Sequence, residues 1–267
     1  MRFNRGVAAV VLVCAAVLCG QAAFAASRPV GVKSLAGVPL RKVWLPGTNA
    51  TQEVCRLGMA GTPVGAVGDE TNGGTIFFGE NDTYWTYMEM RPDSCPACSF
   101  PGGNIGTLSA AHLALYFPFA PETVTVTISV VGSVPVPCHF PNYTDPNAVI
   151  CDEFSATLNC QDPQTTVDFA IPFANPCQIA APAGFFAKAF LGFNFVIASD
   201  TTALNKPQIA VQATARVCNS FNPVGFIPYD FVSEYQVGNP VMYAEVLQCE
   251  DVPVRRYTWG RLKQLYR

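Results

Sequence analysis

Only two histidines, His112 and His139, could supply the base of a Ser-His-Asp or Cys-His catalytic arrangement. His112 lies in an apolar run, where we expect its ring to be satisfied within the fold. His139 follows a cysteine in a proline-rich loop, where we expect a plain surface side chain. The sequence contains no nucleophile-elbow, zincin, phosphate-loop or dinucleotide-binding motif. We therefore predict no catalytic residue, no cofactor and no metal.

Cys95 and Cys98 form a Cys-Pro-Ala-Cys motif, which has the spacing of a redox pair or of half a zinc site. A redox pair needs a parallel strand before it and a helix after it, and the surrounding RPDSCPACSFPGG offers neither. A zinc site needs a second ligand pair at matching spacing, and the sequence has none. We expect a structural disulfide role, and the redox and metal roles stay open as alternatives.

Two of the eleven cysteines lie in the N-terminal leader, and nine remain: Cys55, Cys95, Cys98, Cys138, Cys151, Cys160, Cys177, Cys218 and Cys249. An exported chain would use them mostly as disulfides. Because nine is odd, at least one thiol is free or pairs between chains. From the loops that they enclose, we expect the pairs Cys138–Cys151, Cys160–Cys177 and Cys218–Cys249.

Acidic and aromatic side chains concentrate in the segment GENDTYWTYMEM. The residues concerned are Glu80, Asp82, Tyr84, Trp85, Tyr87 and Glu89. Aromatic faces beside carboxylates suit a sugar, whose C–H faces stack on rings while its hydroxyls bind oxygen groups. Glu80, Asp82 and Glu89 also offer the paired acids of glycoside hydrolysis. The plainer interpretation packs Trp85 and Tyr87 in the core and leaves the acids solvated.

Residues 1–25 resemble a signal peptide. Arg2 and Arg5 precede an apolar run over 6–20, and Ala23–Phe24–Ala25 provides a small-x-small cleavage site. The apolar run is short for a membrane span of about 20 residues. We expect a secreted or cell-surface protein, with a periplasmic location as the alternative, and no transmembrane span in the mature chain.

The body of the chain is predicted to be all-β. Residues 122–132 alternate Val or Ile with Thr or Ser, which indicates a half-buried antiparallel strand. Similar but weaker patterns predict strands over 82–90, 165–171, 188–199, 208–217 and 241–249, and a short one near Thr75. Residues 109–119 fit either a strand or a short helix.

With 50% hydrophobic and only 13% charged residues, this pattern predicts a disulfide-braced, antiparallel two-sheet β-sandwich of jelly-roll or Greek-key type. We place this domain at 75–250. A Gly/Thr/Pro-rich lead-in at 26–74 precedes it, with one strand near 41–45.

Residues 251–267 form a separate basic tail. TWGRLKQLYR can form a short amphipathic helix, for which Thr258 is a usable N-cap. A helix this short needs a surface, which we expect to be export or anchoring machinery, a neighbouring subunit, an anionic membrane or the acidic body itself. The residues predicted to dock are Arg255, Arg256, Trp259, Arg261, Leu262, Lys263, Tyr266 and Arg267.

The charge of the body excludes one class of partner. When the two leader arginines and the five basic residues of the tail are set aside, nine basic residues remain against nineteen acidic ones, which does not suit nucleic acid. The sequence therefore predicts an exported, non-enzymatic binding or structural component with a sorting or docking tail. The alternative is a carbohydrate-binding module or a carboxylate-dependent glycoside hydrolase.

Overall fold

The computed structural model describes residues 32–47, 54–67, 83–98, 103–134, 138–142, 145, 148–182, 185–196, 207–224 and 227–251. These residues form an eight-stranded sheet, here sheet A, a six-stranded sheet, here sheet B, and a two-stranded ribbon. Their only helical element is one 3-10 turn, η1 (Pro96–Cys98). The predicted all-β class is therefore confirmed.

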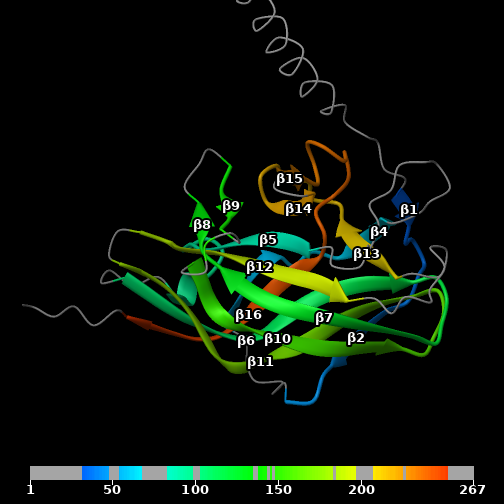
Figure 1. The fold of residues 1–267 in the computed structure, drawn as a ribbon, viewed down its shortest axis with the longest axis horizontal. Coiled ribbons are helices and arrows are strands. Elements are labelled where there is room, and N and C mark those ends of the chain that lie inside the picture. The colour runs from blue at the N-terminus through cyan, green and yellow to red at the C-terminus, as the bar shows by residue number, and fades with distance from the viewer. Residues whose placement is uncertain are drawn as a thin grey trace, which may run out of the picture.

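Sheet A contains β1 (Val32–Ser34), β2 (Leu40–Trp44), β3 (Cys55–Met59), β4 (Pro63–Val67), β6 (Gly103–Phe117), β11 (Thr165–Pro182), β13 (Gln208–Gln212) and β16 (Met242–Asp251). Sheet B contains β5 (Thr83–Met90), β7 (Glu122–Val131), β10 (Val149–Cys160), β12 (Ala187–Val196), β14 (Ser220–Val224) and β15 (Ile227–Asp230). The two-stranded ribbon is β8 (Ser133–Val134) and β9 (Phe140–Pro141), which Figure 1 shows on the same upper side of the view as β14 and β15.

Sheet A runs in the order β1-β4-β13-β6-β11-β2, and β16 lies beside β6 with β3 on its other edge. Sheet B runs in the order β10-β7-β12-β5-β14-β15. The pairs are antiparallel except for β2 with β11, which are parallel. A parallel pair needs a long connection, and more than a hundred residues separate these two strands.

The alternation in β7 places its apolar side chains between the sheets. Val124, Val126, Ile128 and Val130 are at most 1% exposed, whereas the intervening side chains from Thr123 onward include exposed and half-buried ones. The ambiguous segment at 109–119 is a strand, because β6 runs through it and pairs with β11 and β16.

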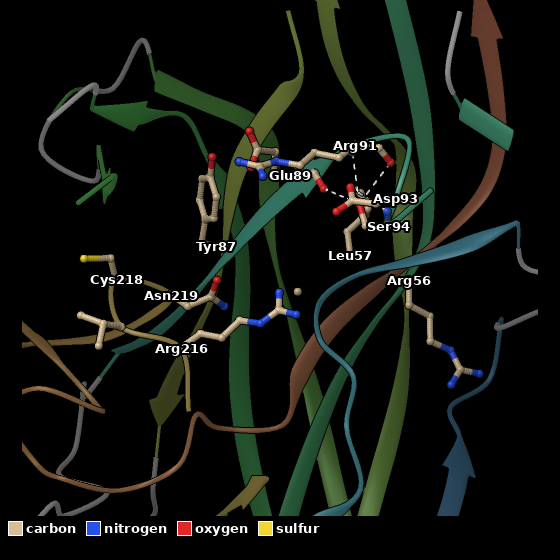
Figure 2. A pocket seen from close by; sticks show the side chains of 12 residues that line it. Arg56, Leu57, Tyr87, Glu89, Arg91, Asp93, Ser94, Arg216, Cys218 and Asn219 are labelled. Atoms are coloured by element: carbon tan, nitrogen blue, oxygen red, sulfur yellow. Dashed lines mark hydrogen bonds and ion pairs between the residues drawn. The ribbon is translucent and has the colours of Figure 1, made fainter. Parts of the chain in front are cut away.

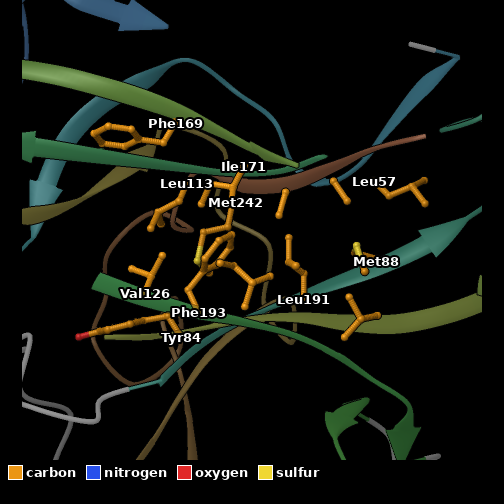
Figure 3. Packing of buried hydrophobic residues seen from close by; sticks show 14 of the residues in the cluster. Leu57, Tyr84, Met88, Leu113, Val126, Phe169, Ile171, Leu191, Phe193 and Met242 are labelled. Carbon is orange, nitrogen blue, oxygen red and sulfur yellow. The ribbon is translucent and has the colours of Figure 1, made fainter. Parts of the chain in front are cut away.

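The two sheets share one hydrophobic core (Figure 3). Sheet A contributes Leu57, Leu113, Phe169, Ile171 and Met242, and sheet B contributes Tyr84, Met88, Val126, Leu191 and Phe193. Each of these side chains is at most 1% exposed. Burying a large apolar side chain stabilises a fold by about 1.5–3 kcal/mol, so this shared layer holds the sheets together.

The lead-in at 26–74 contributes four strands where one was expected. β2 lies at the predicted place, and β1, β3 and β4 also join sheet A. All three side chains of β1 and four of the five in β2 are exposed, so these edge strands carry no apolar alternation to reveal them.

Four disulfides brace the fold, and they join Cys55 to Cys95, Cys98 to Cys249, Cys138 to Cys218 and Cys151 to Cys177. The use of the cysteines as disulfides is confirmed, but the three expected pairs are wrong. The disulfides join cysteines that are neighbours in the folded structure, and not cysteines that enclose a short loop in the sequence. Cys151 of β10 meets Cys177 of β11 across the two sheets, and this leaves Cys160 buried as a free thiol.

The predicted signal segment, the short strand near Thr75 and the C-terminal helix lie outside the described residues. Among the residues that are described, no helix is long and apolar enough to cross a membrane.

Candidate binding pocket between β3 and β5

A pocket of about 270 Å³ opens where β3 of sheet A meets β5 of sheet B (Figure 2). Its position follows from incomplete strand pairing. β14 pairs with β5 only at Ser220–Thr86 and Phe221–Trp85. Beyond that point, a backbone hydrogen bond from Tyr87 N to Asn219 O at 2.7 Å joins β5 to the 216–219 turn, which precedes β14. The edge of β5 therefore diverges from its neighbour and leaves a cavity.

Gly58 allows β3 to approach closely enough to form the opposite wall. Its φ is +108°, and a Cβ added there would lie 2.8 Å from the carbonyl oxygen of Met242. A side chain would therefore meet both an unfavourable backbone conformation and the backbone of β16.

The 216–219 turn is held in place by buried polar side chains. Asn239, which is fully buried, accepts a hydrogen bond from Arg216 N at 2.6 Å and donates one to Arg216 O at 3.1 Å. Asp230 accepts a hydrogen bond from Cys218 N at 2.7 Å, and Cys218 is also bonded to Cys138. The backbone that carries the Arg216 and Asn219 side chains is therefore fixed before any ligand arrives.

Glu89 is neutralised by two cations at the upper side of the pocket. Its Oε2 lies 2.5 Å from Arg91 Nε, and its Oε1 lies 3.5 Å from Lys188 Nζ. The Glu89 side chain is only 8% exposed, so these pairs offset the cost of burying its charge. Arg91 and Lys188 thus share one carboxylate partner, Glu89.

Tyr87 forms a wall beside Glu89. Its ring stacks on His139, with ring centroids 5.1 Å apart and an interplanar angle of 7°. Burial, followed by the nearby Glu89 carboxylate, raises the pKa of the Tyr87 hydroxyl above its ordinary value of 10.0. Tyr87 is therefore a neutral hydroxyl at physiological pH.

Donors on Arg216, Asn219 and Tyr87 lie in the pocket without a hydrogen-bond partner among the described residues. The Arg216 guanidinium points toward the centre of the cavity (Figure 2), and no ion pair or hydrogen bond joins it to another of the described residues. Asn219 Nδ2 is buried and likewise donates to no acceptor in the described ranges. Buried polar groups are normally satisfied, so the unsatisfied Asn219 Nδ2 beside a cavity indicates room for an acceptor, and the exposed Arg216 guanidinium adds a positive charge next to it.

The residues predicted to bind a ligand are divided by the structure. Tyr84 and Trp85 are 0% and 4% exposed and pack in the interior, whereas Tyr87 and Glu89 line the pocket. Glu80 and Asp82 lie outside the described residues, as do the tail residues predicted to dock. Sequence reasoning missed Arg216 and Asn219, because a single arginine and asparagine in a turn form no recognisable motif.

His112 lies away from this pocket, on the face of sheet A that points away from the shared core. Its Nδ1 lies 3.0 Å from Asp168 Oδ1, and its Nε2 lies 3.0 Å from Glu245 Oε1. The Tyr243 ring stacks on it at 4.2 Å, and the Tyr243 hydroxyl donates to Asp168 Oδ2 at 2.9 Å. The ring is fully buried and satisfied, as the sequence suggested.

Cys55, Cys95 and Cys98 bring their Sγ atoms within 4.8 Å of one another, a spacing at which thiolates can ligate one metal ion. In this structure all three sulfurs belong to disulfides, and a disulfide sulfur is not the thiolate that zinc binds.

Comparison of the chain with protein-family models finds no match, and comparison with curated protein sequences finds none either. The class that the structure defines is therefore a disulfide-braced, two-sheet all-β protein with a small polar pocket.

Proposed function

We propose that the protein is an exported, non-enzymatic β-sandwich that binds a small acidic ligand at or outside the cell surface. The observation that supports this proposal is the buried, unsatisfied Asn219 Nδ2 beside the exposed Arg216 guanidinium in a fixed cavity. The four disulfides suit an oxidising compartment, which agrees with export.

The chemistry of the ligand follows from these donors. A guanidinium binds a carboxylate or phosphate through two parallel hydrogen bonds, and the Asn219 amide adds a third donor. Arg91 and Lys188 both pair with Glu89, whereas Arg216 pairs with no carboxylate among the described residues, so we expect an anionic group of the ligand to bind at Arg216. Drug-sized ligands occupy pockets of about 300–1,000 Å³, so a cavity of about 270 Å³ suits a smaller molecule.

A sugar remains a candidate ligand in its acidic form. A uronic acid would present a carboxylate to Arg216 and hydroxyls to Asn219 and Tyr87. Trp85 and Tyr84 do not supply a stacking platform for it, since both are buried. The hydrolase alternative depends on a pair of carboxylates among Glu80, Asp82 and Glu89, and Glu80 and Asp82 lie outside the described residues.

Calorimetric titration with glucuronate, glucose and inorganic phosphate tests this proposal. We expect glucuronate or phosphate to bind and glucose not to bind. Losing hydrogen bonds to a charged group costs about 1.5–3 kcal/mol, so Arg216→Ala should weaken binding roughly 10- to 100-fold. Arg41→Ala is the matched control, because Arg41 is an exposed arginine on β2 that is paired with Asp162. Equal binding by wild type and Arg216→Ala would contradict the proposal.

We further propose that the tail is the sorting or docking element of this protein. Cys249 is the last covalent brace, and β16 ends two residues later at Asp251. Deletion of 254–267 should therefore leave the thermal unfolding temperature nearly unchanged and shift the protein between cell surface and medium. A large fall in the unfolding temperature would instead show that the tail packs on the body.

A further inference from the structure

Four cysteines from three separate segments meet at one end of the molecule. Cys55 begins β3, Cys95 and Cys98 flank the η1 turn, and Cys249 lies near the end of β16. They form two disulfides, Cys55–Cys95 and Cys98–Cys249. We call these four residues the cysteine cluster.

The two disulfides of the cysteine cluster touch each other. Cys95 Sγ lies 2.7 Å from Cys98 Sγ, and Cys55 Sγ lies 4.0 Å from Cys98 Sγ. The turn that sets this contact is fixed by hydrogen bonds from Cys95 N to Arg91 O at 2.7 Å and from Cys98 N to Cys95 O at 3.0 Å. Cys98 is therefore in contact with a sulfur of the neighbouring bridge as well as with its own partner.

This contact is what thiol–disulfide exchange requires, because a thiolate must reach a disulfide sulfur to attack it. Among the described residues, three cysteine sulfurs lie within 4.8 Å of one another only here. The residues Cys95 and Cys98 are 0% and 1% exposed and the Cys55 sulfur is buried as well, whereas the residue Cys249 is half-buried. Cys249 is therefore the member of the cluster that an external thiol would reach.

We propose that the cysteine cluster is an exchange centre that captures an external thiol on Cys249. In the first step the thiolate attacks Cys249 Sγ, the Cys98–Cys249 bond breaks, and Cys98 leaves as a thiolate. In the second step Cys98 attacks Cys95 Sγ, the Cys55–Cys95 bond breaks, and Cys55 leaves as a thiolate that takes a proton from water. The reactants are one thiol and two disulfides, and the products are also one thiol and two disulfides. The two steps therefore need no oxidant or reductant.

The capture site is adjacent to two other elements of the protein. Cys249 lies two residues before Asp251, where β16 ends and the tail follows. The 91–94 segment lines the ligand pocket and leads directly into Cys95. The exchange nevertheless uses sulfurs alone, so it goes beyond the proposed ligand binding and does not depend on it.

The Cys249→Ser variant tests the second step directly, because it leaves Cys98 as a thiol against the Cys55–Cys95 bridge. The folded variant is labelled with N-ethylmaleimide without reductant, and the labelled cysteines are identified by peptide mass mapping. We expect label on both Cys55 and Cys98, since the bridge is shared between two partners. Label on Cys98 alone would overturn the proposal. Cys218→Ser is the matched control, in which Cys138 should be the one newly labelled position.

The wild-type chain provides a second test that needs no folded variant. Incubation with reduced glutathione should add one glutathione to Cys249 and expose one maleimide-reactive thiol on Cys55. The Cys138–Cys218 and Cys151–Cys177 bridges should remain intact. Absence of the adduct, or an adduct with the new thiol on Cys98 alone, would overturn the proposal.

Discussion

Replacing His112 by alanine would leave two carboxylates facing an empty space in the middle of sheet A. The His112 ring is fully buried between Asp168 and Glu245, at 3.0 Å from an oxygen of each. Glu245 is itself 3% exposed, so water cannot readily take the place of the imidazole. The variant therefore removes the shared partner of two acidic groups.

The expected cost can be worked from these contacts. Removing one member of a buried ion pair destabilises a protein by about 3–5 kcal/mol, because a buried charge is left uncompensated. Lys42 Nζ remains 3.3 Å from Glu245 Oε1, and the Tyr243 hydroxyl remains bonded to Asp168. We therefore expect the lower end, about 3 kcal/mol near pH 6. At about 2–4 °C per kcal/mol for a chain of this size, the unfolding temperature should fall by roughly 6–12 °C.

The pH dependence has a defined sign. Burial by itself lowers the pKa of His112, but the Asp168 and Glu245 carboxylates outweigh it and raise the pKa above its ordinary value of 6.5. A group whose pKa is raised by folding stabilises the fold fully below its unfolded pKa and loses that contribution as pH rises through its folded pKa. The difference in unfolding free energy between wild type and His112→Ala should therefore shrink as pH increases from 6 to 9.

Guanidinium chloride unfolding at pH 6, 7, 8 and 9, without reductant, measures this difference. His139→Ala is the matched control, because His139 is half-buried, stacks on Tyr87 and lies between no pair of carboxylates. The reasoning is refuted if the His112→Ala difference stays constant over this range or grows with pH.

Two further predictions concern buried positions. Burial raises the pKa of Glu122 from 4.5 to about 7, so wild-type stability should fall as pH rises through about 7. Glu122→Gln should therefore be more stable than wild type by about 1–2 kcal/mol at pH 8 and not at pH 5; urea titrations that show wild-type stability flat between these values would contradict this. A Cβ at Gly192 would overlap the Trp85 ring, so Gly192→Ala should cost about 1–3 kcal/mol in thermal unfolding. Gly132→Ala, whose nearest neighbour would lie at 3.5 Å, is its control, and equal losses for both would argue against overpacking.

The strands were predictable where one face is buried and the other is not. β7 alternates strictly and was recognised over nearly its whole length. β6 stayed ambiguous, because Ala110, Ala111, Leu113 and Ala114 are all at most 2% exposed, which shows that both of its faces are covered. A strand covered on both faces has no alternation, and its sequence cannot be told from a buried helix.

The pocket could not be predicted from the sequence. Tyr87 lies on β5, whereas Arg216 and Asn219 lie in a turn more than a hundred residues later. They meet because β14 leaves β5 after two paired residues, and register of that kind is set by packing on the rest of the sheet. The aromatic residues that the sequence revealed are likewise divided: Tyr84 and Trp85 are buried, whereas Tyr87 lines the pocket.

What the sequence determined by itself is the all-β class and the use of the cysteines as disulfides, since alternation and cysteine number are local or compositional properties. Which cysteines pair, and which side chains surround a cavity, was decided only by the tertiary structure. Cys98 and Cys249 are 151 residues apart, yet their Cα atoms lie 5.1 Å apart. Contacts over such a separation depend on how strands from distant parts of the chain are ordered in two sheets, and no short stretch of sequence carries that order.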